Sequence, residues 1–468
     1  MQEGDFTATT AAFLQWFKAL PGATFSDAID IVDLRFRDAG RGIIALRDIP
    51  TDTTLFTIPR NAVINSDTSS LKAKLPHLFE SQGDEDDEQA LDTWSSLILI
   101  MMHEFFLGNQ SKWKPYLDIL PLTFDTPMFW SEGEVAYLQA SAMVNKIGKA
   151  DAEEMFRARL IPVIRANPST FMSSVEYSDE DLIQLAHRMG STIMAYAFDL
   201  EKEEANGDDE SDGWVEDREG RSMMGMVAMA DILNADAEFN VHVNHGDDEL
   251  TVTSIRDIKA GEEILNYYGP HPNSELLRRY GYITDKHSRY DVVEIPWDAV
   301  QHSLISELGV PQDIMAETME KMDQDDLEDT FVLERDSSEP NPDGTFAGPA
   351  VVDGVPADLK EQLKATIKLL QKREGNPNSE KRKRDDILQS TMIATLRLIA
   401  SRYPTTDAED ELLLARDTLT RRQRMAVQVR LGEKKLLKEA CDHISGRAAQ
   451  AVPNTDAAET AKRAKRSE

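Results

Sequence analysis

The sequence predicts an α+β fold, in which small β-sheets are interrupted by a helical insertion and followed by an all-α C-terminal domain. Short β-branched runs broken by turn residues fill residues 15–64 and return at 250–268, as expected for short strands. Apolar residues at helical spacing dominate residues 90–200 and return after Pro296. Strand-rich segments on both sides of the first helical block indicate one domain with an insertion.

The first strands are expected between Gln15 and Ile64, in four runs: AIDIVDLRF, GIIALRDI, TTLFTI and AVI. The helical block begins near Trp94, where apolar residues recur at intervals of three and four. Strands are expected again in LTVTSI at 250–255 and EEILNYY at 262–268, on either side of the turn DIKAG.

Two apolar stripes after Pro296 predict the helices of a separate C-terminal domain. Each stripe repeats at helical spacing, and the members are Leu359, Leu363, Ile367 and Leu370, then Leu388, Met392, Leu396 and Ile399. We therefore expect a first domain at 10–290, with its insertion at about 90–200, and a helical domain at 296–447.

Three polar segments are expected to lie outside these elements. Residues 199–219 contain eleven carboxylates and two basic residues, which favours a mobile acidic loop. Residues 335–349 have the Pro, Gly, Asn and Asp content of a loop. The last residues, 448–468, are expected to form a flexible basic tail.

The charge is strongly acidic and unevenly distributed. The 468 residues contain 84 Asp and Glu against 51 Lys and Arg, for a net charge of −33. Residues 358–468 hold 24 basic and 17 acidic residues, or +7, which leaves −40 on the rest. A negative field of this size repels nucleic acid and attracts cationic partners, although it also serves solubility alone. We therefore expect no direct nucleic acid partner.

Cysteine content and hydropathy exclude several classes of protein. The single Cys441 cannot form an internal disulfide or a multi-cysteine zinc site, and no metal site is expected. The longest apolar stretch, Leu97 to Met102, is far shorter than the roughly 20 residues that span a bilayer. The N-terminus is acidic where a signal peptide needs basic residues. No membrane association is expected.

Common catalytic motifs are missing, and one apparent motif does not fit its context. The sequence has no GxxxxGK[ST], HExxH or GxSxG, so P-loop, zincin and serine-hydrolase classes lack their anchor residues. Gly40, Gly42 and Ala45 spell the dinucleotide-binding pattern GxGxxA. That pattern requires a helix to begin at the glycines, whereas Pro50 and Thr51 cut the next segment short. A nicotinamide site is therefore disfavoured.

Three clusters remain as candidates for a site, and each has an ordinary structural alternative. The first is Gly40 and Gly42, which would let a ligand lie against bare backbone or could form a simple hairpin turn. The second is Asp231 and Asn234, polar residues within an apolar run that could also belong to a capped helix or turn. The third is a set of tyrosines, which could be core aromatics or line a pocket: Tyr267, Tyr268, Tyr280 and Tyr282.

Taken in order, these clusters resemble a known family. The segments AGRGIIALRDIPTDTTLFTIPRNAVI, ADILN, AGEEILNYYG and RYGYI are similar to those of SET-domain protein lysine methyltransferases. The segment from Trp94 to Pro121, MAYAF at 194–198 and RRQRMAVQVRLGEKKLL at 421–437 resemble the Rubisco large-subunit methyltransferase branch, which includes fungal ribosomal lysine methyltransferases. The resemblance covers residues 10 to 440.

The resemblance implies a SET-domain β-fold, S-adenosylmethionine as cofactor and methyl transfer to a lysine of a basic protein. A large-subunit ribosomal protein is the expected substrate, and the helical C-terminal domain would dock it. A chromatin or transcription protein is the alternative substrate, and a non-catalytic SET-like binding module is the alternative function. We expect the chain to act as a monomer.

The resemblance also assigns roles to individual residues. Tyr280 would be the catalytic tyrosine and would also contact the cofactor. The other expected cofactor contacts are Ala39, Gly40, Arg41, Tyr196, Asn234 and Ala235. The lysine channel would be lined by Phe198, Tyr268 and Tyr290. One departure is Ala235, which stands where the family usually has histidine after the asparagine, so one expected cofactor contact is reduced to backbone.

A basic run bears on location. Lys381 to Arg384 reads KRKR and follows the polar segment GNPNSE. Such a run is typical of a nuclear import signal, or alternatively of a solvated loop between helices. We expect the protein in the nucleus, with the cytoplasm as a second location.

Overall fold

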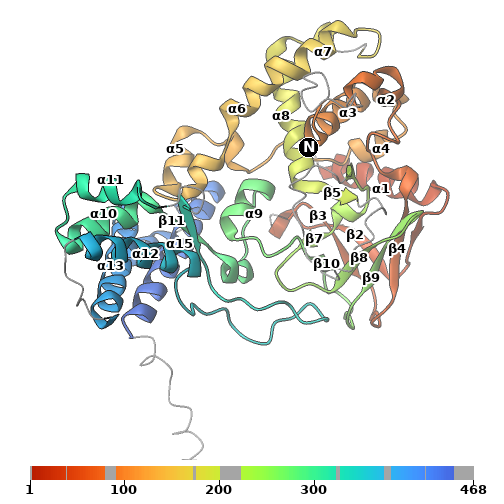
Figure 1. The fold of residues 1–468 in the computed structure, drawn as a ribbon. Helices are drawn as coiled ribbons and strands as arrows, with labels where there is room; N and C mark the ends of the chain where they lie inside the picture. Colours follow the sequence, from red (N-terminus) through yellow and green to blue (C-terminus); the bar gives the residue numbers. More distant parts are fainter. Residues whose placement is uncertain are drawn as a thin grey trace, which may run out of the picture.

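The computed structural model describes residues 3–37, 39–79, 91–171, 175–200, 223–322, 327–373, 381–416 and 418–446. Most of the expected acidic loop and the whole expected basic tail lie outside these residues. Within them, the predicted architecture is confirmed: small sheets, a helical insertion and a helical C-terminal domain follow one another along the chain (Figure 1).

The N-terminal part begins with helix α1 (Glu3–Ala19) and continues with four strands: β1 (Thr24–Phe25), β2 (Ile29–Asp33), β3 (Arg41–Ala45) and β4 (Thr54–Pro59). The first strand therefore begins at Thr24 and not near Gln15. The residues up to Ala19 belong to α1, which buries Phe13 and Phe17 on one face. The expected strand AVI forms only an isolated bridge, between Ile64 and Met226.

The remaining strands of this part come after the insertion. They are β5 (Ala197–Leu200), β6 (Met223–Met226), β7 (Asn234–Ala235), β8 (Val241–His245), β9 (Glu249–Ser254) and β10 (Leu265–Asn266). The predicted strand at 250–255 is confirmed as β9. The predicted strand at 262–268 is mostly irregular, since only Leu265 and Asn266 form a strand, in parallel with β7, and Glu263 forms an isolated bridge with Ile44.

Strands from the two sides of the insertion pair with each other. The largest sheet has the order β1-β4-β9-β8, and Phe56 of β4 lies opposite Val252 of β9. Beside it, β3 pairs with β2, and the Ile264 N–H donates to the Ile43 carbonyl at 2.8 Å. The insertion therefore interrupts a single β-rich unit, as Figure 1 shows at the right.

The insertion contains helices α2 (Ser70–Lys74), α3 (Thr93–Leu107), α4 (Lys114–Leu117), α5 (Glu132–Val135), α6 (Lys149–Met155), α7 (Ile161–Ala166) and α8 (Asp179–Tyr196). Helix α3 is buried on nearly all faces and packs against α8. Trp113 anchors the insertion to the β-unit, because its indole N–H donates to the Ala62 carbonyl at 2.8 Å.

After the β-unit, α9 (Asn273–Tyr280) leads to the C-terminal domain. This domain has helices α10 (Trp297–Leu308), α11 (Gln312–Met319), α12 (Ala357–Arg373), α13 (Lys381–Ser401), α14 (Asp407–Leu414) and α15 (Arg421–Ile444). Both predicted apolar stripes are buried or partly buried in its core. It also includes one short antiparallel sheet, β11 (Val293–Pro296) with β12 (Thr330–Leu333).

The basic run at 381–384 has helical backbone and forms the first turn of α13. The segment at 335–349 has no helix or strand, as predicted. Among the helices that the structure describes, none combines the length and apolar character that crossing a bilayer requires.

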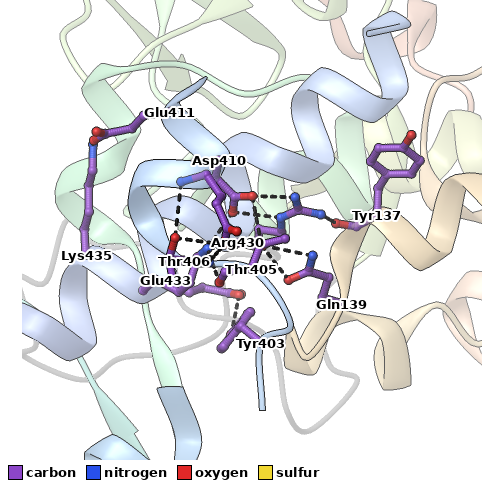
Figure 2. Close-up of polar contacts among 12 residues, drawn as sticks. Tyr137, Gln139, Tyr403, Thr405, Thr406, Asp410, Glu411, Arg430, Glu433 and Lys435 are labelled. Carbon is purple, nitrogen blue, oxygen red and sulfur yellow. Dashed lines mark hydrogen bonds and ion pairs between the residues drawn. The ribbon is translucent and has the colours of Figure 1, made fainter. Parts of the chain in front are cut away.

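Helix α15 joins the C-terminal domain to the insertion. Figure 2 shows the polar part of this contact, where Arg430 forms two hydrogen bonds with the buried Asp410 carboxylate and donates to the Tyr137 carbonyl. Glu433 accepts hydrogen bonds from Ser141 of the insertion at 2.6 Å and from Tyr403 at 2.8 Å. The insertion and the C-terminal domain are therefore held together by buried charged groups.

Candidate active site

The three sequence clusters meet in the β-unit. The Asn234 amide donates to the Arg41 carbonyl at 3.1 Å and to Glu263 Oε1 at 2.7 Å. Gly42 lies against the same group, because a Cβ there would stand 2.9 Å from Asn234 Nδ2 and 2.4 Å from Leu34. Glycine is thus required at position 42 by close packing, and the Asn234 side chain holds β3 against the segment before β10.

The loop before β3 is closed by its own backbone hydrogen bonds. Gly40 has φ +66°, which favours glycine, and a Cβ there would meet no atom within 4 Å. The Gly40 carbonyl accepts from the Leu34 N–H at 2.7 Å, and the Ala39 N–H donates to the Leu34 carbonyl at 3.2 Å. The loop is therefore closed on itself, with open space beside Gly40.

The Arg41 side chain turns away from this space, toward α1. Its guanidinium donates to Thr10 Oγ1 at 2.8 Å and to the Ile119 carbonyl at 2.9 Å, and it stacks 4.0 Å from the Phe6 ring centroid. Burial lowers the pKa of Arg41 to about 10. The contacts of the Arg41 side chain are thus with α1 and the insertion, and its expected contact with a cofactor stays a prediction.

Tyr268, Tyr280 and Tyr282 form one aromatic group. The rings of Tyr268 and Tyr280 stack with centroids 4.9 Å apart, and Tyr282 lies 6.0 Å from Tyr280. The Tyr268 hydroxyl donates to the Leu233 carbonyl at 2.7 Å, next to Asn234. Burial raises the pKa of Tyr280 to about 12, so its hydroxyl is a neutral donor at physiological pH.

The sequence grouped Asp231 with Asn234 as a candidate but gave it no role, and the structure shows it hydrogen-bonded to the insertion. Its Oδ2 accepts a hydrogen bond from the Tyr116 hydroxyl at 2.5 Å, while its shielded Oδ1 has no partner among the described residues. Burial raises the pKa of the Asp231 carboxyl to about 7. Burial, together with the Asp231 charge, raises the pKa of Tyr196 to about 12.

The other two predicted channel residues differ in their surroundings. Phe198 is buried in β5, where it pairs with Gly225 of β6. Tyr290 belongs to a different aromatic group, because its hydroxyl lies 3.2 Å from that of Tyr267 and its ring is 6.3 Å from Phe346. The contacts of Tyr290 are thus separate from the Tyr268–Tyr280 pair, and its role in the channel stays a prediction.

Ala235 lies buried in β7, opposite Asn266 of β10. The Tyr282 hydroxyl donates to the Ala235 carbonyl at 3.3 Å. Tyr282 thus stands beside the position where the usual histidine is missing.

Tyr116 is the group that sequence reasoning missed, whereas Asp231 was a candidate that received no role. Asp231 is an acidic residue inside the apolar run MVAMADIL, and a buried carboxyl could have been inferred from that run alone. Tyr116 gave no such signal, because only the packing of the insertion against the β-unit brings it to Asp231.

The residues present fit a sulfonium cofactor. Stacked tyrosine rings attract a cation through their faces, and the unpartnered Asp231 oxygen is the kind of buried acceptor that a cationic ligand satisfies. The open space beside Gly40 leaves room for a ligand along the loop backbone.

Comparison with known families places two domains on the chain. Residues 40–269 match the SET domain family, and residues 318–437 match the Rubisco LSMT substrate-binding family. The chain is 32% identical over 308 residues to "Ribosomal lysine N-methyltransferase 4" of Saccharomyces cerevisiae, a match that covers 64% of this chain and 60% of that protein.

Other relatives agree with this placement. The chain is 30% identical to "N-lysine methyltransferase setd6" of Xenopus laevis, over 52% of this chain and 50% of that protein. It therefore spans only half to three fifths of the length of these two relatives. The fold is similar to that of Rubisco LSMT bound to sinefungin and monomethyllysine, with a TM-score of 0.62, 18% identity, and coverage of 97% of this chain and 99% of that one.

Proposed function

We propose that this chain is a member of the SET-domain family, in the branch that joins a SET domain to a Rubisco LSMT substrate-binding domain, and that it is an S-adenosylmethionine-dependent protein-lysine N-methyltransferase. The observation that carries the proposal is the stacked Tyr268–Tyr280 pair, in which Tyr268 lies at the end of the SET match and donates to the carbonyl next to Asn234. That pair combines cation-attracting rings with a neutral hydroxyl donor.

The cofactor site of this proposal is formed by the loop before β3 and by β7. Backbone groups of Ala39, Gly40 and Arg41 and the Ala235 backbone hold the cofactor, with Tyr196 against it and Asn234 fixing the two strands. S-adenosylmethionine supplies an electrophilic methyl group on a sulfonium. Tyr282 contributes to the adenine side, where Ala235 replaces the usual histidine.

The channel residues have to deliver a neutral lysine amine. A free lysine with a pKa near 10.4 is neutral in only roughly one of a thousand molecules at pH 7. Aromatic walls formed by Tyr268, Phe198 and Tyr280 disfavour the ammonium form, while the ionised Asp231 attracts the cation into the channel. With S-adenosylmethionine bound, the neutral amine would be the nucleophile for its methyl group, and these residues would hold and orient that amine.

Tyr280 acts in this scheme by orientation. Its pKa of about 12 makes it a poor base at neutral pH, so its hydroxyl donates or accepts a hydrogen bond and aligns the reacting groups. Tyr290 stays a candidate for the outer wall of the channel. Its hydroxyl contacts that of Tyr267, so it lies outside the Tyr268–Tyr280 pair.

We propose a large-subunit ribosomal protein as the substrate. Two relatives in different yeasts carry the name ribosomal lysine N-methyltransferase 4, at 32% and 28% identity. The net charge of −33 also favours a basic protein. A chromatin or transcription protein is the alternative, because the relatives named N-lysine methyltransferase setd6 carry no ribosomal substrate in their names.

The test is methyl transfer from labelled S-adenosylmethionine to ribosomal proteins taken from a strain that lacks this enzyme. We expect one labelled large-subunit protein, with the lysine identified by mass spectrometry. Labelling of histones instead would support the alternative substrate. Failure of the cofactor to shift the melting temperature, together with no labelling, would support a non-catalytic binding module.

We also propose that the protein enters the nucleus, on the basis of the run Lys381 to Arg384. Replacing the four residues by alanine should move a fluorescent fusion of the full chain to the cytoplasm. An unchanged distribution would remove the run from import.

A further inference from the structure

Arg422 of α15 binds a segment of the insertion through every nitrogen of its guanidinium. Its Nε donates to Asp125 Oδ1 at 3.0 Å, and its Nη2 donates to the Phe124 carbonyl at 3.2 Å. Its Nη1 donates to the Phe129 carbonyl at 3.1 Å and to Glu134 Oε2 at 3.4 Å. A planar, five-donor group is required for this set of contacts, which a lysine ammonium could not reproduce.

The bound segment, Phe124 to Trp130, is fixed at two more points. The neighbouring Arg421 pairs with the other oxygen of the Asp125 carboxylate. The Trp130 indole N–H donates to the Asp125 carbonyl at 2.8 Å, which closes the segment into a tight loop. The position of the Asp125 backbone is therefore determined from the C-terminal domain.

The Asp125 backbone in turn lies directly against the end of α9. A Cβ on Gly281 would stand 3.1 Å from the Asp125 carbonyl carbon and 3.1 Å from the Thr126 nitrogen. Gly281 has φ +75° and ends α9, with its N–H donating to the Leu276 carbonyl at 3.1 Å. Tyr280 is the residue immediately before it, so the segment limits where the Tyr280 backbone can lie.

Helix α9 is also held by α15 on an apolar side. Leu277 of α9 is fully buried in a cluster with Met425 and Val429 of α15 and with Trp130 of the bound segment. Figure 1 shows α9 between the β-unit and the C-terminal domain. One helix of the C-terminal domain thus contacts both the segment behind Gly281 and the helix that carries Tyr280.

We propose that Arg422 is a positioning residue for Tyr280, acting through the Phe124–Trp130 segment that it binds and against which Gly281 packs. The C-terminal domain is thereby part of the catalytic geometry as well as a docking surface. This inference rests on the proposed function for its kinetic consequence, but its structural part can be measured without any activity.

The first measurement is amide hydrogen exchange of α9 and Gly281 in the full chain carrying Arg422→Lys. Lysine keeps the charge but loses most of the contacts, so the amides of residues 273–284 should exchange at least ten times faster than in the unmodified protein. The matched control is Arg424→Lys, because Arg424 lies on the same helix and donates instead to the Leu414 carbonyl at 3.0 Å. The control should leave exchange at 273–284 unchanged.

The second measurement is methyl transfer to large-subunit ribosomal proteins with labelled S-adenosylmethionine. A displaced Tyr280 slows the chemical step, and a shift of roughly 1 Å can cost about a hundredfold. Arg422→Lys should therefore lower kcat by tenfold or more, while the KM for S-adenosylmethionine changes by less than about threefold. Asp125→Asn, which weakens the same contact, should lower kcat in the same direction.

The outcomes separate the inference from the function on which it rests. Unchanged exchange at 273–284 in Arg422→Lys would overturn the inference, as would equal kcat values for Arg422→Lys and Arg424→Lys. If the unmodified protein transfers no methyl group while the exchange difference is present, the proposed function fails and the structural coupling stands. A general loss of structure is recognised by faster exchange in β4 and β9 as well.

Discussion

At the scale of single residues, Tyr280 is the most informative side chain. Tyr280→Phe should fold and bind S-adenosylmethionine, because its ring still stacks on Tyr268, but it should lose most methyl transfer, by about a hundredfold. Calorimetry with the cofactor and a labelled methyl assay measure the two effects. Tyr267→Phe is the matched control, since Tyr267 contacts Tyr290 and not Tyr280; undiminished turnover in Tyr280→Phe would remove that hydroxyl from the mechanism.

Asp231 predicts a pH dependence of catalysis. Its pKa of about 7, raised by burial, means that the carboxyl is mostly protonated at pH 6 and mostly ionised at pH 8. Only the ionised form attracts a lysine cation, so Asp231→Asn should match the unmodified protein at pH 6 and fall severalfold below it at pH 8.

The comparison is made on kcat/KM for the protein substrate at both pH values. An equal loss at pH 6 and pH 8 would mean that the Asp231 charge plays no part. Asn can still accept the Tyr116 hydrogen bond, so the variant tests the charge and not the packing.

Much of the candidate site could be predicted at this scale, because its residues lie in short motifs. Gly40, Asn234 and Tyr280 each belong to a run of four or more residues with a recognisable pattern. Two kinds of information were missing. The first is the partner of Asp231, because Tyr116 is contributed by the insertion. The second is the direction of two neighbouring side chains: Tyr267 contacts Tyr290, whereas Tyr268 stacks on Tyr280.

At the scale of elements, the contact between α15 and the insertion predicts how stability depends on pH. Burial raises the pKa of Glu433 to about 7, well above the value near 4.3 of an unfolded glutamate. Between these values the folded chain keeps a proton that the unfolded chain has released. Stability therefore falls as pH rises from about 5 to 7 and then levels off.

Glu433→Gln removes this titration while it keeps an acceptor for Ser141. The melting temperature of the variant should fall less between pH 5 and 8 than that of the unmodified protein. Over this range the variant should lose less free energy of unfolding than the unmodified protein, by about 3 kcal/mol at most. The variant should still lose some stability as the pH rises, because burial also raises the pKa values of Asp291 and Asp231 to about 7. Identical slopes in the two proteins would show that Glu433 is ionised in the fold.

Long periodic elements could be predicted from the sequence, and short ones could not. The apolar stripes predict helices α12 and α13 directly, because four apolar residues at helical spacing require a helix with one buried face. The two-residue strands β7 and β10 have no such pattern; they exist because tertiary contacts, such as that from Asn240 to the Leu265 N–H at 2.8 Å, hold them together. The sheet of β11 and β12 was missed for the same reason.

At the scale of the whole molecule, the uneven charge predicts a salt dependence. Residues 1–357, which include the β-unit and the insertion, carry a net charge of −40, so we expect a basic substrate to be attracted before it binds. Raising ionic strength from about 0.05 M to 0.5 M should lower kcat/KM for a basic protein by tenfold or more, while kcat at saturation changes little. Free lysine as the methyl acceptor is the control, since its single side-chain charge is steered far less. A kcat/KM that does not respond to salt would show that the excess acid serves only solubility.

The pairing of β4 with β9 across the helical insertion has a consequence for how the chain is made. Strands β2, β3 and β4 leave the ribosome first, yet the main partner of β4 ends only at Ser254. At 5 to 20 residues per second, roughly ten seconds or more pass before that partner is synthesised. During this interval the edge of β4 that later pairs with β9 has no strand beside it, although β1 is already made. An unpaired strand edge can pair with another chain, so we expect the nascent chain to need protection until translation has passed the insertion.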